Sequence, residues 1–191
     1  TRQTPLSGFA PGSLAVIQSA AGKTLGAGYV NPRSLICARL LTRRPRAALD
    51  AGFFERRLRS ALSLRESRFE QPYYRRVFGE SVGLPGLVVD RYARVLVVQI
   101  TTAGMEALRD LLLEVLDRVF SPRGILLRND SSVRLLEGLP QETQVIGEVP
   151  ATVVLSEGGV RFELPLGEGQ KTGWFYDQRS NLQAMHKYVG G

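Results

Sequence analysis

The side chains best suited to binding a nucleotide lie between residues 167 and 179, near the end of the chain. Three glycines there allow a ligand to approach the backbone closely. The segment then supplies a cation, a hydroxyl, three aromatic rings, a carboxylate, an amide and a guanidinium, in the order Lys171, Thr172, Trp174, Phe175, Tyr176, Asp177, Gln178 and Arg179. Stacking rings beside polar groups suit a nucleobase or an adenosine cofactor. A hairpin held by aromatic packing, with an Asp–Arg pair at a helix start, would use the same residues.

The segment contains neither of the two common phosphate-binding motifs. A Walker A motif needs a glycine directly before the Lys-Thr pair, where this chain has Gln170. The dinucleotide fingerprint fails because its third glycine comes one residue late, at Gly173. We therefore expect no nucleotide hydrolysis.

Catalysis by the chain's own side chains has little support. His186 is the only histidine, it has no visible base partner, and no G-x-S-x-G elbow is present. Cys37 is the only cysteine, and its apolar neighbours are typical of a small buried residue. This set cannot form a four-ligand zinc site or an internal disulfide. The sequence predicts no catalytic residue and no metal site in this chain, and a reducing cytoplasm fits it.

The composition is that of a globular protein with an excess of arginine. The 191 residues are 43% hydrophobic and 23% charged, with a net charge of +7. No run approaches the roughly 18 apolar residues of a membrane helix, so we expect no membrane partner. The positive excess favours a phosphate backbone as partner. Many of the arginines fall in one stretch: Arg39, Arg43, Arg44, Arg46, Arg56, Arg57, Arg59, Arg65 and Arg68.

Short β-rich runs open the chain. Residues 13–18, 24–30 and 35–41 predict three strands separated by turn sequences, which suggests a small barrel or sandwich. Residues 50–66 then predict a helix with Asp50 as its N-cap. Its polar face carries Arg56 and Arg59, which either face solvent or face RNA.

A second unit, expected from Tyr73 onward, has more strands than helices and is therefore α+β. The apolar patterns predict strands at 87–92, 94–100, 124–128, 143–148, 152–156 and 160–164 and an amphipathic helix at 105–119. The last two strands should form a hairpin through Glu157-Gly158-Gly159. A helix is expected at 180–188.

Segments 26–34, 38–42, 75–92 and 169–181 read GAGYVNPRS, ARLLT, RRVFGESVGLPGLVVDRY and GQKTGWFYDQRSN. Together they resemble bacterial class I SAM-dependent methyltransferases that act on 23S ribosomal RNA and form 5-methylcytosine. The first two segments resemble the end of that family's PUA domain and the third resembles the start of its central domain. The fourth resembles its signature hairpin, which precedes a Rossmann-like catalytic domain.

The resemblance implies an α+β chain in which a small PUA-like β-barrel precedes a mixed α+β central domain ending in a β-hairpin, with the Rossmann-like methyltransferase domain absent. The expected domains are a front-truncated PUA-like RNA-binding domain (1–45), a basic helical linker (46–72), the central domain (73–166), and the signature hairpin with the start of the methyltransferase domain (167–191). The family's opening His-Pro-Trp segment and its Gly-rich SAM loop are missing, and Cys37 is misplaced for the nucleophile. We therefore expect the chain itself to be inactive.

The implied cofactor of the parent enzyme is S-adenosyl-L-methionine, with weak or no binding by this chain. Its pocket would use Lys171, Thr172, Phe175, Asp177, Gln178 and Arg179. The implied partner is ribosomal RNA, docked by Arg33, Arg39, Arg43, Arg44, Arg56 and Arg59, and the family is compatible with a homodimer. Two alternatives stay open: a free-standing RNA-binding or ribosome-associated module without catalysis, and a structural or interaction domain whose hairpin binds no ligand.

Overall fold

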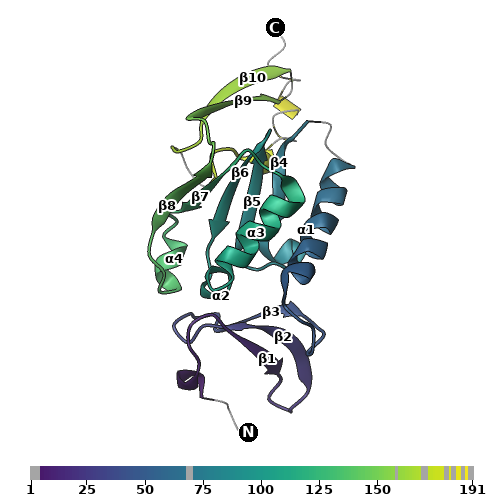
Figure 1. Ribbon diagram of the computed structural model, residues 1–191, viewed down its shortest axis with the longest axis vertical. Helices are drawn as coiled ribbons and strands as arrows, with labels where there is room; N and C mark the ends of the chain where they lie inside the picture. Colours follow the sequence, from purple (N-terminus) through teal and green to yellow (C-terminus); the bar gives the residue numbers. More distant parts are fainter. Residues whose placement is uncertain are drawn as a thin grey trace.

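The computed structural model describes residues 5–67, 71–157, 159–168, 172–178, 181, 184, 185 and 188. Three sheets follow one another along the long axis of the molecule: a three-stranded N-terminal sheet, a five-stranded central sheet and a two-stranded hairpin (Figure 1). None of the helices among these residues is long and apolar enough to cross a membrane.

The N-terminal sheet is antiparallel and follows a short 3-10 turn, η1 (Leu6–Gly8). Its strands are β1 (Ser13–Gln18), β2 (Thr24–Val30) and β3 (Ala38–Thr42), in the order β1-β2-β3. Within the described residues, β1 and β3 each pair with one strand only, so the sheet stays open. The expected small β-barrel is therefore wrong, because closure requires every strand to have two neighbours.

Helix α1 (Ala51–Glu66) begins where the sequence predicts, and Asp50 caps it by accepting a hydrogen bond from the Phe53 N–H at 2.9 Å. Its apolar side buries Phe54 and Leu58 completely in the core of the central unit. The helix lies beside α3 on one face of the central sheet (Figure 1). The helix that we expected in a linker is thus packed onto the central unit.

The central sheet has the strand order β4-β5-β6-β7-β8. These strands are β4 (Tyr73–Phe78), β5 (Leu87–Tyr92), β6 (Val95–Ile100), β7 (Gly124–Asn129) and β8 (Glu142–Gly147), and the shorter elements are η2 (Gly79–Val82), α2 (Ala103–Glu106), α3 (Arg109–Phe120) and α4 (Val133–Leu136). Only β6 and β7 are parallel, and α2 and α3 form the crossover between them. Helices α1 and α3 cover the face that holds the larger core.

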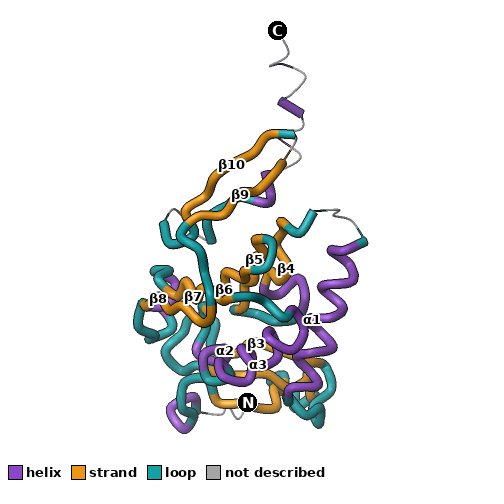
Figure 2. The backbone as a smooth tube through the Cα atoms, turned by 45° about the horizontal axis from the view of Figure 1, so that its top comes forward, coloured by secondary structure: helices purple, strands orange, loops and turns teal. Residues whose placement is uncertain are grey.

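The hairpin of β9 (Thr152–Glu157) and β10 (Val160–Pro165) projects from the end of the central sheet (Figure 2). It shares the smaller core, on the other face of the central sheet, with Tyr92, Trp174 and Tyr176. The segment at 167–191, expected as a signature hairpin, has no strand among its described residues; residues 172–178 contain the 3-10 turn η3 (Tyr176–Gln178). That expectation is wrong, and the predicted helix at 180–188 falls mostly outside the described residues.

Candidate functional site

A pocket of about 360 Å³ lies where β3 leads into α1, and we call it the basic pocket. It is lined by Thr42, Arg44, Ala47, Phe53, Arg56, Arg57 and Ser60. The lining includes three arginines and no acidic residue. One wall comes from the end of the N-terminal sheet and the following loop, and the other from the first turns of α1. The way in which these two parts pack therefore shapes the pocket.

Arg57 is held in place before any ligand arrives. Its Nη2 donates to the Leu41 carbonyl oxygen at 2.8 Å, and its Nη1 donates to that of Val82 at 3.2 Å. The guanidinium carbon also lies 5.0 Å from the centre of the Phe53 ring. Gly83 leaves the necessary room, because a Cβ atom there would lie 1.5 Å from Arg57 Nη1. Since a guanidinium carries five N–H donors, Arg57 keeps donors for a ligand.

Arg44 and Arg56 are both exposed, and within the described part of the chain neither forms an ion pair. The two hydroxyls of the lining already make local hydrogen bonds. Ser60 Oγ donates to the Arg56 carbonyl oxygen at 2.9 Å, and Thr42 Oγ1 accepts from the Arg44 N–H at 3.1 Å. Thr42 therefore keeps its own hydroxyl hydrogen as a donor.

Two of the arginines predicted to bind RNA are already neutralised. Arg59 pairs with Glu55 at 2.8 Å, and its hydrogen bond is the main reason that the pKa of the Glu55 carboxyl lies below its usual value. Arg39 lies within 3.4 Å of a Glu80 carboxylate oxygen and 3.5 Å of one from Glu137. Each pair weakens the attraction of its arginine for phosphate.

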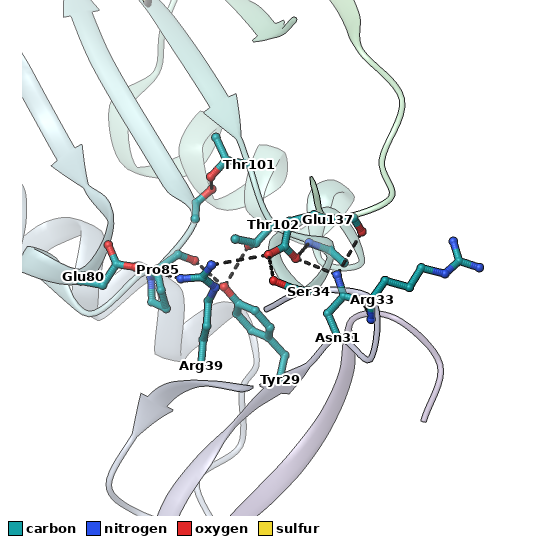
Figure 3. A network of polar contacts seen from close by, with 12 residues as sticks. Tyr29, Asn31, Arg33, Ser34, Arg39, Glu80, Pro85, Thr101, Thr102 and Glu137 are labelled. Carbon is teal, nitrogen blue, oxygen red and sulfur yellow. Dashed lines mark hydrogen bonds and ion pairs between the residues drawn. The ribbon is translucent and has the colours of Figure 1, made fainter. Parts of the chain in front are cut away.

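The remaining predicted arginines are spread out. Arg33 is exposed and points away from the network in Figure 3, and Arg43 is exposed. Of the six predicted RNA-binding residues, the basic pocket brings together Arg44 and Arg56. Sequence reasoning missed Arg57 as a site residue. Its signal was an arginine four residues after Phe53, on the apolar side of the predicted helix.

A polar network fastens the N-terminal sheet to the central unit (Figure 3). The carboxylate of Glu137 accepts hydrogen bonds from Asn31 Nδ2 at 2.8 Å, Ser34 Oγ at 2.7 Å and the Ala103 N–H at 3.2 Å. Burial alone would raise the pKa of the Glu137 carboxyl, but these hydrogen bonds and the charge of Arg39 lower it below its ordinary value. Glu137 is therefore held as a buried, satisfied anion.

Tyr29 makes the second contact between the two parts. Its hydroxyl lies 2.8 Å from the Pro85 carbonyl oxygen, to which it donates, and 2.9 Å from Thr102 Oγ1. Burial raises the pKa of Tyr29 to about 12, so the hydroxyl keeps its proton at neutral pH. A Cβ atom at Gly104 would lie 2.0 Å from the ring, so glycine is required there.

Thr172, predicted to bind the cofactor, is fully buried and anchors its segment to the central sheet. Its hydroxyl bonds to Asp90 Oδ2, and its carbonyl oxygen accepts from the Tyr92 hydroxyl at 3.1 Å. Asp90 is fully buried as well and forms a two-pronged pair with Arg75, at 2.8 and 2.9 Å. Burial, with the nearby charge of Asp90, raises the pKa of the Tyr92 hydroxyl.

The aromatic residues of this segment divide into two groups. Trp174 Nε1 donates to Glu157 Oε2 at 2.8 Å, and the Tyr176 hydroxyl donates to the Arg91 carbonyl oxygen at 2.8 Å, so both serve packing. Phe175, in contrast, is 39% exposed, and Gln178 is also exposed.

The other predicted cofactor-binding residues cannot be placed. Lys171 and Arg179 lie outside the described residues, and so does the side chain of Asp177. The cofactor role of the whole set stays a prediction.

Comparisons with known proteins agree on one kind of relative. A family model described as a PUA-like domain matches residues 3–43. Ribosomal RNA large subunit methyltransferase I of Aliivibrio fischeri (strain MJ11) is 40% identical over 173 residues, which is 88% of this chain and 44% of that protein. The protein of the same name from Aeromonas hydrophila is 42% identical over 176 residues, 89% of this chain and 44% of that protein. The chain thus spans a little under half the length of these relatives.

Two solved structures share the fold. A chain from Streptococcus mutans described as a SAM-dependent methyltransferase superposes with a TM-score of 0.77 at 18% identity, over 92% of this chain and 46% of that chain. A methyltransferase complexed with SAH superposes with a TM-score of 0.75 at 18% identity, over 90% of this chain and 44% of that chain. At this identity the likeness concerns the fold.

These matches correct the expected fold class. We expected an α+β chain with the Rossmann-like methyltransferase domain absent, but nine tenths of the chain superposes on SAM-dependent methyltransferases and aligns with rRNA methyltransferases. Absence of that domain was inferred from where the sequence stops, and this inference is wrong. The expectation that the chain lacks catalytic machinery and is inactive loses its basis with it.

Proposed function

We propose that this protein is a SAM-dependent methyltransferase of large-subunit ribosomal RNA, and that the residues described here dock the RNA. The names of the relatives support the reaction and the substrate. The finer assignment, methyl transfer to C5 of a cytosine in 23S ribosomal RNA, rests on the sequence resemblance. Since ribosomal RNA is made and modified in the bacterial cytoplasm, we place the protein there.

One observation carries the docking role: the basic pocket gathers three arginines, without an acidic side chain, at the border of the PUA-like region. Phosphate groups supply most of the affinity of proteins for nucleic acids. An arginine fork is better suited than lysine to hold a phosphate. The pocket thus offers the chemistry that an RNA backbone requires, on a surface that the Glu137 network holds in a fixed orientation.

The segment around Phe175 fits one wall of an adenosine pocket. Thr172 and Tyr176 fasten it to the central sheet, which leaves Phe175 and Gln178 exposed on a short, anchored turn. A ring and an amide side by side can stack on adenine and reach its polar edge. S-adenosyl-L-methionine, when bound, supplies the methyl group.

The chain's own residues act by positioning. The Asp90–Arg75–Thr172 junction fixes the segment that carries Phe175 and Gln178. The Glu137 network sets the angle between the N-terminal sheet and α1, and so the shape of the basic pocket. Holding two reactants in a fixed relation lowers the entropic part of a reaction barrier. A homodimer and the expected domain boundaries stay predictions.

The test of the reaction uses the protein as the cell makes it. Large-subunit ribosomal RNA from cells lacking the gene is incubated with the protein and S-adenosyl-L-methionine carrying a labelled methyl group. We expect label in the RNA at a single nucleotide, and small-subunit RNA serves as the control. RNA binding without labelling of any RNA would favour the alternative, an RNA-binding or ribosome-associated module without catalysis.

A further inference from the structure

We propose that the basic pocket binds one phosphodiester group of an RNA strand through Arg44, Arg56 and Arg57, and that Arg59 on the same helix takes no part. This inference rests on the proposed RNA-docking function and deepens it. It commits to a ligand class, a pocket and a division between neighbouring arginines that carry the same charge.

Arg57 is the fixed donor of this site. Its two hydrogen bonds to main-chain carbonyl oxygens, of Leu41 and Val82, orient the guanidinium. A pre-oriented group loses less side-chain entropy when a ligand binds. Because carbonyl oxygens carry only partial negative charge, the full positive charge of Arg57 remains available to an anion.

Arg44 and Arg56 supply mobile charge on either side of this fixed donor. Both are exposed, come from opposite walls of the pocket and have no ion pair among the described residues. Thr42 contributes a hydroxyl hydrogen as well, since its oxygen already accepts the Arg44 N–H. An anion in the pocket would thus meet three cations and one neutral donor.

The pocket is unsuited to a base, which decides the ligand class. Phe53 is its only aromatic residue, is 7% exposed, and has the Arg57 guanidinium over its ring. No open aromatic face is therefore left for stacking, on which recognition of an unpaired base depends. The donors that remain fit the tetrahedral oxygens of a backbone phosphate.

Arg59 provides the internal contrast. It lies on α1 between Arg56 and the end of the helix, but Glu55 holds it at 2.8 Å, and Glu55 also lies within 3.5 Å of Arg118. Arg59 does not line the pocket. Net charge alone would make Arg56 and Arg59 equivalent, whereas the structure makes them different.

The test compares Arg44→Gln/Arg56→Gln with Arg59→Gln in RNA binding over a salt series. The chain is titrated with an unstructured RNA oligonucleotide, and the slope of log K against log salt is measured. For the double variant we expect the slope to become shallower by about 0.7 to 0.9, the value for one lost phosphate contact, and the affinity at low salt to fall about tenfold or more. Arg59→Gln should keep the wild-type slope.

A second variant addresses the fixed donor. Arg57→Lys keeps the charge but removes the planar fork, so we expect weaker RNA binding with little change in the slope. Circular dichroism and the unfolding midpoint establish that the variant is folded. If it does not fold, the comparison of Arg44→Gln/Arg56→Gln with Arg59→Gln decides the proposal alone, because those three arginines are exposed.

The outcomes separate this inference from the proposed function. RNA binding with equal losses for the double variant and Arg59→Gln would overturn the pocket and leave the docking function intact. No RNA binding by the wild-type chain at low salt would overturn the docking function itself. Vesicles containing phosphatidylglycerol form the last arm: if they bind as tightly as RNA, with the same dependence on Arg44 and Arg56, the assignment to RNA is wrong.

Discussion

Asn31 Nδ2 donates a hydrogen bond to Glu137 Oε2 at 2.8 Å, although the two residues are 106 positions apart in the chain. The contact joins the loop after β2 to the loop after α4, and so the N-terminal sheet to the central unit (Figure 3). Because the basic pocket has one wall on each part, its shape depends on this junction.

Glu137→Ala should lower the free energy of unfolding by about 1–3 kcal/mol, because the Asn31 amide, the Ser34 hydroxyl and the Ala103 N–H would lose a shared buried acceptor. Urea unfolding measures the change. Glu148→Ala is the matched control: its side chain is 70% exposed and pairs only with Arg123, so the effect should stay within about 0.5 kcal/mol. Equal effects of the two variants would show that the junction does not stabilise the fold.

The same carboxyl predicts how stability depends on pH. Since the folded state lowers the pKa of Glu137 below its ordinary value of 4.5, the unfolded state takes up the proton first as the pH falls. The stabilisation is complete above pH 4.5 and is lost as the pH falls through the lower, folded pKa. Urea unfolding over this acidic range should show a steeper loss for the wild type than for Glu137→Gln. Identical pH profiles would contradict this.

Thr172→Val should loosen the cofactor segment. The substitution removes the hydroxyl that meets the buried Asp90 carboxylate and costs about 1–3 kcal/mol. Trp174 is the only tryptophan and lies two residues away, so its fluorescence should shift toward the red as the segment becomes wetter. Thr143→Val, at an exposed position in β8, should leave the emission unchanged. An unshifted spectrum for Thr172→Val would mean that Tyr92 and Tyr176 suffice to hold the segment.

Gly83→Ala should weaken RNA binding from outside the pocket. The new Cβ atom would lie 1.5 Å from Arg57 Nη1, so the guanidinium must move. Gly83 also has a φ of +70°, which adds a backbone cost of about 1 kcal/mol. Gly22→Ala controls for that cost, because Gly22 has a φ of +79° with nothing within 4 Å of the added atom. RNA titrations should show a loss for Gly83→Ala only; matching losses would exclude a role for the position of Arg57.

Local patterns predicted the elements well where they depend on neighbouring residues. β1 and β2 lie where turn sequences and β-rich runs placed them, and Asp50 caps α1 as its side chain suggests. β3 starts later than expected, at Ala38, because the preceding residues form a loop closed by the bond from the Asn31 N–H to the Cys37 carbonyl oxygen.

Features built from distant parts of the chain could not be predicted in this way. The partners of Glu137 come from positions more than 30 residues away, and nothing near Glu137 in the sequence announces them. The sorting of the arginines is of the same kind for Arg39, whose partners are Glu80 and Glu137. Arg59 differs, since Glu55 four residues earlier is a pattern that the sequence did contain.

The central claim is that this chain docks RNA through phosphate contacts, and equilibrium binding to a large-subunit ribosomal RNA fragment at increasing salt tests it most directly. We expect binding at low salt whose logarithm falls linearly with the logarithm of the salt concentration, with a slope set by several phosphate contacts. Absence of binding at low salt, or an affinity that does not change with salt, would contradict the claim.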